Sequence, residues 1–517
     1  MQKDFGLQPK VSMPRSTFNR SHGHKTTFDG GYLVPILRDE VLPGDTLKCK
    51  MEGFARLSTP AFPVMDNMFL ETFFFFVPLR LVWDNFNRFM GEQINPGDST
   101  DFVTPKMTVP NGGYGEMSLQ DYLGLPTKVD GYTHHAFYTR AHNLIYNEWF
   151  RDQNLQERVT VDTDDGPDTD TDYVLLRRGK RHDYFTSCLP WPQKGDAVDL
   201  PIGSTAPIIT TDEQIQFKNL SDSQEKGAET GTGGVGGVGT IEFASAWTSN
   251  NDNLGFGATT GLEADLTNAT AATINSWRLS LQVQAMLELE ARCGTRYTEI
   301  VYGHFGVSSP DARLQRPEYL GGGKSIVNMH PVLGTTNANF GDTGAFATAS
   351  MNGHGFVKSF TEHGVILGFV NCRADLTYQQ GLDREFSRDD KLDYFWPKLA
   401  NIGEQAVLTK EIYCSTDGSG NDIVFGYQGR SDEYRYKNSY ISGLFRSNAT
   451  APLDAWHLSQ EFANTPVLNE EFIVDEPPID RVVNVTTEPH FIADFYFGYY
   501  HTRTMPTYGI PGSLGRF

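Results

Sequence analysis

Residues 70–92 read LETFFFFVPLRLVWDNFNRFMGE, and this stretch limits the possible folds more than any other part of the chain. Its four consecutive phenylalanines, Phe73 to Phe76, are too few for a transmembrane helix, which needs about 20 apolar residues. Successive side chains of a β-strand point to opposite faces, so two of these rings would lie on each face. Both faces must then be buried, either inside one domain or with one face covered by another protein.

The residues after the four phenylalanines predict the end of this strand and a short helix. Pro78 lacks an N–H donor, so it limits further pairing of the strand. From Asp84 onward, Phe86, Phe89 and Met90 recur at helical spacing. We therefore expect a core strand followed by a short amphipathic helix.

The composition is typical of an elaborated β-rich protein. The chain has 517 residues, with 51 Gly, 27 Pro and 12% aromatic residues, a mixture that favours many turns, long loops and a large core. No apolar run is long enough to span a membrane, and the N-terminus has no apolar segment like that of a signal peptide. The five cysteines are scattered without a CxxC motif, which favours reduced thiols.

Hydrophobic patterning predicts mainly β-structure with a few helices. Strands are expected where β-branched and aromatic residues cluster, at residues 46–57, 69–77, 363–372, 406–414 and 491–501. Helices are expected at residues 135–152 and 274–293, where apolar residues recur at helical spacing. Prolines and paired glycines disfavour regular structure at residues 1–45, so this segment is predicted to be an extended arm.

The net charge of −21, from 64 acidic and 43 basic residues, argues against a chain that neutralises a nucleic acid by itself. The first 25 residues are an exception, because they carry five basic residues and one acidic residue. The candidates for contact with nucleic acid are Lys3, Lys10, Arg15, Arg20 and Lys25. Exposed termini are also often basic without any function, so both interpretations stay open.

Residues 210–273 differ in composition from the sequence around them. They are rich in Gly, Thr and Asn and include the glycine run Gly231–Gly239. Such a composition buries little apolar surface, and a flexible linker is one interpretation. Alternatively, Phe243, Trp247, Leu254 and Phe256 anchor a compact excursion from the main fold.

Sequence motifs for catalysis, nucleotides or metals are incomplete. Residues 320–325 (LGGGKS) imitate the end of a phosphate-binding loop, but the position that requires its first glycine is Glu318. The acidic run at residues 162–172 (DTDDGPDTDTD) fails the EF-hand pattern and is expected to be a solvated loop. Neither His22 with His24, nor His134, His135 and His142, comes with convincing carboxylate or thiolate partners. We therefore predict no enzyme activity, no catalytic residue, no metal site and no cofactor.

Several ordered blocks carry a resemblance to a known family. They are residues 54–60 (FARLSTP), 63–67 (PVMDN), 146–154 (YNEWFRDQN), 181–187 (RHDYFTS), 189–193 (LPWPQ), 294–299 (GTRYTE), 309–321 (SPDARLQRPEYLG) and 503–517. Together with residues 70–92, these blocks resemble the major capsid protein of gokushovirus-type microviruses, which are small icosahedral phages with single-stranded DNA. The blocks span most of the chain.

The resemblance implies a single eight-stranded antiparallel jelly roll of the viral capsid type, with long insertions. Its expected organisation is an N-terminal arm at 1–45, a first part of the jelly roll at 46–209, a variable insertion at 210–273, and a helix with the remaining jelly roll and a C-terminal arm at 274–517. The expected function is assembly of sixty copies into a T=1 capsid around circular single-stranded DNA. The capsid is expected to assemble in the cytoplasm of the bacterial host.

The resemblance also implies partners. These are a small basic DNA-packaging protein, a DNA pilot protein, and a bacterial surface receptor, for which a glycan is one candidate. The insertion is expected to form protrusions at the threefold axes and to attach to the host. Its candidate residues are Gly233, Gly236, Trp247, Asn250, Asn251 and Phe256.

Contacts between subunits are expected at aromatic and charged residues of the resembling blocks. The candidates are Phe74, Phe76, Trp83, Arg313, Arg316, Glu318 and Arg503. Arg313, Arg316 and Glu318 alternate in charge within a proline-bounded loop, which suits ion pairs across or within subunits. From composition alone, the alternative is a secreted β-rich protein that binds or degrades carbohydrate.

Overall fold

The computed structural model describes residues 14–198, 208–211, 215–219, 225–231, 240–243, 254–256, 262–264, 274–311, 315–334, 343–416, 418 and 420–508. The chain divides into two units, one of residues 1–192 with 290–517 and one of residues 193–289.

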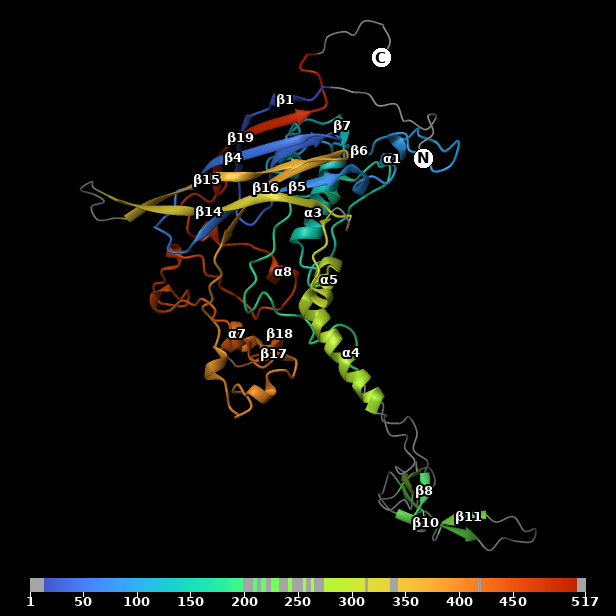
Figure 1. Cartoon of the computed structure of the whole chain (residues 1–517). Coiled ribbons are helices and arrows are strands. Elements are labelled where there is room, and N and C mark those ends of the chain that lie inside the picture. The colour runs from blue at the N-terminus through green and yellow to red at the C-terminus, as the bar shows by residue number, and fades with distance from the viewer. Residues whose placement is uncertain are drawn as a thin grey trace. The chain divides into compact units, whose positions relative to one another are not determined.

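The first unit is built on one antiparallel sheet (Figure 1). The strands are β1 (Ser16–Asn19), β2 (His22–Phe28), β3 (Val34–Val41), β4 (Thr46–Leu57), β5 (Met68–Pro78), β14 (Glu318–Leu333), β15 (Thr343–Ser359), β16 (Gly364–Ala374) and β19 (Phe491–Arg503). Eight strands follow the order β1-β19-β4-β15-β14-β5-β16-β3, and β2 also pairs with β19. The expected mainly β fold with an eight-stranded antiparallel jelly-roll-like sheet is confirmed.

The sheet curls into a half-barrel, because strands from the two ends of its order share one core. Val34 of β3 and Phe495 of β19 belong to the same buried cluster. Side chains also join the two edges: Arg20, between β1 and β2, lies 2.6 Å from the Asp39 carboxylate of β3. Arg503 of β19 donates a 2.9 Å hydrogen bond to the backbone oxygen of Glu40. The curl places one face of every long strand in a common core.

Both faces of the phenylalanine run are buried by this same chain. Phe74 and Phe76 point into the core of the curled sheet. Phe75 belongs to a second core on the opposite face, with half-buried Phe73 beside it. Helix α3 (Phe137–Ile145) and the π-helix η3 (Tyr146–Phe150) cover that face. The ring centroids of Phe75 and Trp149 are 5.5 Å apart, so the expected double-sided burial needs no second protein.

Two of the sequence expectations for secondary structure are wrong. Residues 16–41, expected without regular structure, form β1, β2 and β3. Pro35 fits into β3 because the pairing with β16 shifts register there, between Gly368 and Phe369. The strand expected at 406–414 ends at Leu408, where the Glu411 carboxylate accepts the Leu408 N–H and starts a helical turn.

The other predicted elements are present at or near the expected positions. The helix expected at 135–152 is α3 with η3, the short helix after Asp84 is α1 (Phe86–Phe89), and the helix expected at 274–293 is α4 (Ile274–Cys293). A further helix, α5, covers Tyr297–Phe305. No helix among the described residues is both long and apolar enough to cross a membrane.

The remaining described elements of the first unit are short. They are β6 (Lys106–Thr108), α2 (Leu119–Tyr122), β7 (Thr133–His135), β17 (Glu404–Leu408), α7 (Thr409–Ile412), β18 (Val424–Gly429), α8 (Glu470–Ile473) and 3-10 turns at Leu79–Leu81, Asp170–Asp172, Arg384–Phe386, Pro397–Leu399, Asp432–Tyr434, Gly443–Phe445, Asp454–Trp456 and Ile479–Arg481.

The second unit contains small antiparallel sheets of its own. Its strands are β8 (Ile208–Thr210), β9 (Gln216–Asn219), β10 (Glu225–Gly231), β11 (Thr240–Phe243), β12 (Leu254–Phe256) and β13 (Leu262–Ala264), paired in the orders β11-β10-β9-β12 and β13-β8. The rings of Phe217 and Phe256 stack with centroids 5.8 Å apart. The described parts of residues 210–273 therefore include paired strands.

Candidate functional site: a basic pocket

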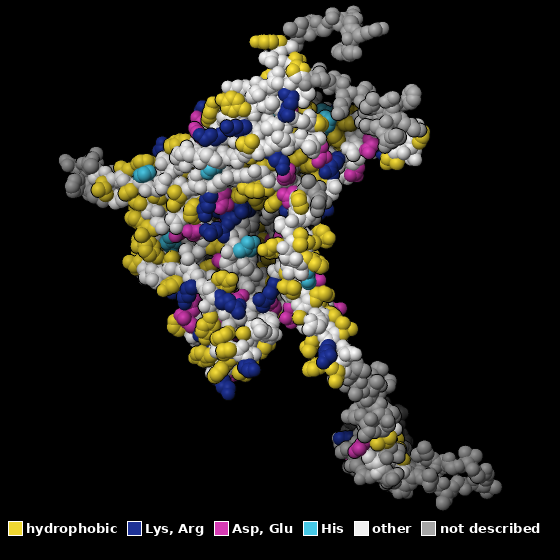
Figure 2. All heavy atoms as spheres, in the orientation of Figure 1, with side chains coloured by type: hydrophobic (Ala, Val, Ile, Leu, Met, Phe, Trp, Pro, Cys, Tyr) yellow, Lys and Arg dark blue, Asp and Glu magenta, His cyan; other side chains and the backbone are white. Residues whose placement is uncertain are grey.

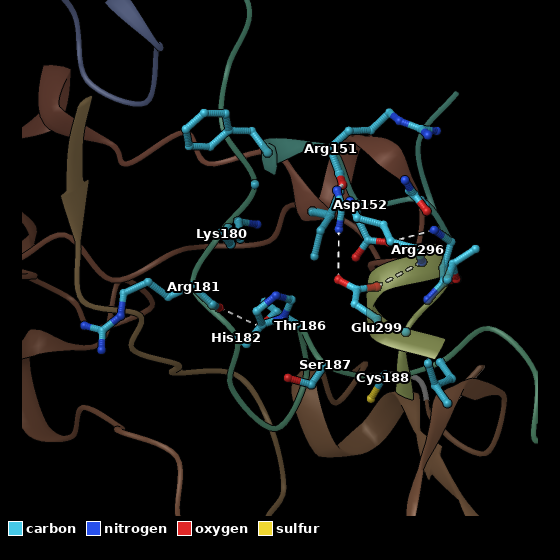
Figure 3. A pocket seen from close by; sticks show the side chains of 18 of the residues that line it. Arg151, Asp152, Lys180, Arg181, His182, Thr186, Ser187, Cys188, Arg296 and Glu299 are labelled. Atoms are coloured by element: carbon cyan, nitrogen blue, oxygen red, sulfur yellow. Dashed lines mark hydrogen bonds and ion pairs between the residues drawn. The ribbon is translucent and has the colours of Figure 1, made fainter. Parts of the chain in front are cut away.

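A pocket of about 500 Å³ in the first unit gathers residues from four of the sequence blocks that carried the family resemblance (Figure 3). Its walls come from residues 149–154, at the end of η3 and just after it, from 178–182 and 186–189, and from 291–296, which join the end of α4 to α5. Glu299, Arg373 and Ile473 complete the lining. The blocks are far apart in the sequence, and only the fold brings them together.

Basic side chains dominate the walls of this pocket. Seven of the lining residues are Arg or Lys and two are Asp or Glu. The whole chain has the opposite balance, with 43 basic and 64 acidic residues. Some of these cations are paired, since Arg181 lies 2.6 Å from Asp375 and Arg296 lies 3.3 Å from Glu299. Arg178 pairs with Glu71 and Arg292 with Glu404.

Among the described residues, two further cations of the pocket, Arg151 and Lys180, form no ion pair with a carboxylate, and a third, Arg373, forms only a long one. Arg151 donates from Nη1 to the backbone oxygen of Gln156 at 2.8 Å, and Lys180 donates to the backbone oxygen of Phe472. Arg373 is 7% exposed, and its nearest carboxylate, that of Glu71, is 3.9 Å away. The pocket therefore holds more positive charge than its own carboxylates neutralise.

The pKa values of these three groups are all lowered, chiefly by burial. Burial lowers the pKa of Lys180 to about 8. Burial, followed by repulsion from Arg178, lowers the pKa of Arg373 to about 10. Burial and the neighbouring Arg296 also lower the pKa of Arg151. Each shift shows that the charged form is less well stabilised here than in water.

Aromatic side chains form one wall of the pocket. Trp149 donates a 3.0 Å hydrogen bond from its indole nitrogen to the backbone oxygen of Pro317, and the guanidinium of Arg316 lies 4.3 Å from its ring centroid. Phe150 lies below the guanidinium of Arg178 at 5.4 Å. These contacts hold the wall in place from two sides.

The predicted nucleic-acid contacts lie elsewhere, and the three described ones have partners in this chain. Arg15 donates to the backbone oxygen of Gly44, Arg20 pairs with Asp39, and Lys25 lies 3.4 Å from Asp494. The side chain of Lys25 is 81% exposed and that of Arg20 is 43% exposed. Lys3 and Lys10 lie outside the described residues.

Three of the predicted subunit contacts are instead buried in the chain itself. Phe74, Phe76 and Trp83 have exposed fractions of 0%, 5% and 0%. The curled sheet covers the two phenylalanines, and Trp83 donates from its indole nitrogen to Asp165 at 2.7 Å. These side chains are inaccessible to another subunit because the chain's own residues surround them.

The charged candidates for subunit contact also have partners within the chain. Arg316 pairs with Asp311 at 2.8 Å, Glu318 with Lys358 at 2.6 Å, and Arg503 with Asp45 at 2.8 Å. Arg313 lies outside the described residues. Of the insertion candidates, Phe256 is 60% exposed, whereas Gly233, Gly236, Trp247, Asn250 and Asn251 are not described.

The acidic run at 162–172 is not simply a solvated loop, as its sequence suggested. The Asp168 side chain is fully buried and accepts a 2.7 Å hydrogen bond from Nε of Arg140, itself fully buried. Tyr173 donates to the same carboxylate at 2.9 Å. The run therefore supplies the counter-charge for a buried arginine of α3.

Comparison with known proteins decides the family. Residues 8–513 match the family described as "Capsid protein (F protein)". The chain is 48% identical over 529 residues to the capsid protein VP1 of Bdellovibrio phage phiMH2K, covering 100% of this chain and 98% of that protein. It is 43% identical to the capsid protein VP1 of Chlamydia phage 1, covering 99% and 98%, and 34% identical to that of Spiroplasma virus 4, covering 98% and 97%.

The chain belongs to this capsid protein family. The expected kinship with gokushovirus-type microviruses is confirmed, and the protein is the major capsid protein of a single-stranded DNA phage of this kind. It is a structural component of the virion and not an enzyme. The alternative of a secreted carbohydrate-active protein is wrong, because a capsid family accounts for nearly the whole chain.

This capsid protein also exposes an aromatic surface that its sequence did not reveal. Six side chains of the segments around β17 and β18 are between 48% and 73% exposed: Phe386, Tyr394, Trp396, Tyr434, Tyr436 and Tyr440. Arg388 lies 4.4 Å from the ring centroid of Tyr434. Figure 2 shows hydrophobic side chains gathered over the lobe that carries these strands in Figure 1. No regular period marks these residues, because they come from loops and short turns.

Proposed function

We propose that sixty copies of this capsid protein assemble into a T=1 icosahedral shell around a circular single-stranded DNA genome. The aromatic surface defined by Phe386, Tyr394, Trp396, Tyr434, Tyr436 and Tyr440 is the observation that carries this proposal. Soluble monomers rarely leave a contiguous apolar patch of this kind in water, and such patches mark contacts with other proteins. Membership of a capsid family identifies the partner as further copies of the chain.

One sequence must supply every contact in such a shell. Heterologous contacts that close into rings meet this requirement, because each copy presents one surface to a different surface of its neighbour. Individual contacts can be weak, since cooperative closure multiplies them. The charged candidates for these contacts are Arg313, Arg316, Glu318 and Arg503, in addition to their partners within the chain.

The second unit is proposed to protrude from the shell and attach to a bacterial surface receptor, with a glycan as one candidate. Its separate strand pairings support this role, because a unit with its own sheets tolerates sequence change without disturbing the main sheet. Exposed Phe256 is the described residue proposed for this contact.

The net charge of −21 supports separate partners for the genome. A small basic DNA-packaging protein would supply the positive charge that this chain lacks, and a DNA pilot protein is a further proposed partner. The basic N-terminal residues, of which Lys25 is exposed, are proposed to contact the DNA backbone without sequence preference.

Assembly is tested on the purified protein by sedimentation velocity and negative-stain electron microscopy. We expect closed particles of uniform diameter, and the double variant Phe386→Ser with Tyr436→Ser should remain folded by circular dichroism but sediment as small species. A small oligomer of the unchanged protein under every condition would overturn the proposed shell.

Attachment is tested by deleting residues 231–267 from the phage-encoded chain. The deletion should leave particle assembly intact and reduce adsorption to host cells by at least tenfold. Particles that adsorb normally would contradict the attachment role, and loss of assembly would show that the segment is part of the shell.

A further inference from the structure

We propose that the basic pocket at the end of η3 binds a phosphate group. The pocket is open to solvent, holds about 500 Å³ and is lined by seven basic and two acidic residues. Phosphate is the ligand chemistry that such a wall favours, because arginine presents paired N–H donors that match phosphate oxygens.

Buried arginine N–H groups at the pocket that lack an acceptor support the binding of an anion there. Nε of Arg373, Nε of Arg151 and Nε of Arg296 are buried and have no hydrogen-bond acceptor among the described residues. Buried donors are nearly always paired in folded proteins, so three of them around one cavity are unusual. Arg373 is the strongest case, since its side chain is 8% exposed and the Glu71 carboxylate is 3.9 Å away.

The carboxylates nearby supply only part of the counter-charge that the cations of the pocket need. Glu71 already pairs with Arg178, and Glu299 accepts hydrogen bonds from both the backbone and the side chain of Arg296. Asp475 lies close enough to influence Arg373 and Lys180, but it is 4% exposed and burial raises its pKa to about 6. At neutral pH its carboxylate offsets part of the charge of Arg373 and Lys180, but among the described residues it forms no ion pair with either of them. The open pocket therefore leaves room for an anion beside these cations.

The pocket also accommodates more than a single phosphate. Partly exposed Trp149 and Phe150 line the same cavity as Arg151 and Lys180. An aromatic wall beside a cationic one suits a nucleotide, whose base stacks while its phosphate is held. Two sources of this chemistry are available, a free phosphate compound or, if the proposed DNA-filled shell is correct, the backbone of the packaged strand.

The proposal is tested by isothermal titration calorimetry of the purified protein with three probes at low and moderate salt. The probes are inorganic phosphate, ATP and a twelve-nucleotide oligothymidylate. Arg151→Gln should weaken binding at least tenfold, and Arg373→Met should do the same. The matched control is Arg430→Gln, because Arg430 is also half-buried and also donates to one backbone oxygen, that of Leu392 at 2.8 Å. The dissociation constants of this control variant should stay within twofold of those of the unchanged protein.

The three probes distinguish a free phosphate compound from the backbone of the packaged strand as the source of the bound phosphate. Binding of phosphate or ATP that is lost in Arg151→Gln assigns a free phosphate compound, and binding of oligothymidylate alone assigns the packaged strand. Absence of binding by all three probes, or an equal loss in Arg151→Gln and Arg430→Gln, overturns the proposal. If Arg373→Met does not fold, as judged by thermal unfolding, Arg151→Gln with Lys180→Met decides the outcome. Microscopy of the same variants should still show assembled particles. A result that contradicts phosphate binding is therefore distinguishable from a result that contradicts capsid assembly.

Discussion

Gly322 of β14 lies directly opposite Phe73 of β5 in the main sheet. The glycines of the LGGGKS segment, which imitates part of a phosphate-binding loop, therefore pair with the phenylalanine run. A β-carbon added at Gly322 would collide with the backbone oxygen of Thr72. The glycine is required by the close approach of two strands and not by a nucleotide.

Replacing Gly322 with alanine should destabilise the unassembled subunit by about 1–3 kcal/mol, the usual effect of overpacking. Urea unfolding followed by tryptophan fluorescence measures the change. Gly115→Ala is the matched control, because a β-carbon there meets no atom within 4 Å. If Gly322→Ala and the control unfold with equal free energies, β14 and β5 can move apart locally to admit the added methyl group without loss of stability.

The buried pair of Arg140 and Asp168 should be among the most sensitive sites in the chain. Both side chains are fully buried, so Asp168→Asn removes the only buried carboxylate that the described residues place beside Arg140 and leaves the exposed Asp164, 3.3 Å away, as its remaining counter-charge. The substitution should lower the free energy of unfolding by about 3–5 kcal/mol. The Arg80–Glu362 pair is partly exposed, and Glu362→Gln should cost at most about 1 kcal/mol. Thermal and urea unfolding compare the two variants. A similar cost for both would mean that Arg140 finds another partner.

His142 of α3 should make the subunit less stable in mild acid. Burial lowers the pKa of this histidine to about 4, and its Nδ1 lies 3.1 Å from the side-chain oxygen of Asn143. Because that Asn143 amide donates to the backbone oxygens of Thr160 and Asp172, its oxygen faces the ring, and the neutral ring donates to it.

The sign of this pH dependence follows from proton uptake. The unfolded chain binds a proton near pH 6.5 and the folded chain only near pH 4, so the contribution of His142 is full above pH 6.5 and is lost as the pH falls toward 4. The loss amounts to roughly 3 kcal/mol when complete. His142→Gln should reduce the difference in urea midpoint between pH 7.5 and pH 5. An unchanged difference would assign the acid sensitivity to other groups.

The second core should depend on Phe75 more than on Phe73. Phe75 is 1% exposed and contacts the rings of Trp149 and Phe369. Phe75→Ala should therefore lower the free energy of unfolding by about 3–5 kcal/mol. Phe73 is half-buried, and Phe73→Ala should cost less. Urea unfolding of both variants shows which substitution lowers the free energy of unfolding more. The reverse order would place the main contact of α3 and η3 on the edge of this core.

Local patterning was sufficient for the long elements. The β-branched and aromatic content of residues 69–77 and the helical spacing of apolar residues at 274–293 correspond to β5 and α4, because each segment's local sequence favours its own conformation. Patterning failed at residues 16–41, where short strands gain their stability from pairing with β16 and β19. Those partners lie far along the chain and leave no mark on the local composition.

The candidate site was less accessible to sequence reasoning than the fold. Arg151, Arg181 and Arg296 stood in the recognised blocks, but nothing in their spacing showed that the blocks share one pocket. Likewise, charge alone suggested that Arg20 and Arg503 face partners, whereas the structure uses them to join the edges of the curled sheet.

The sequence by itself determined that both faces of the Phe73–Phe76 run are buried, that the chain is mainly β, and that it resembles a capsid protein. These properties depend on side-chain order and on blocks readable in one dimension. Only the tertiary structure decided that α3 and η3 of the same chain cover Phe75, and that seven basic residues meet in one pocket. The physical reason is that burial and charge balance depend on neighbours in space, and the curl of the sheet chooses those neighbours.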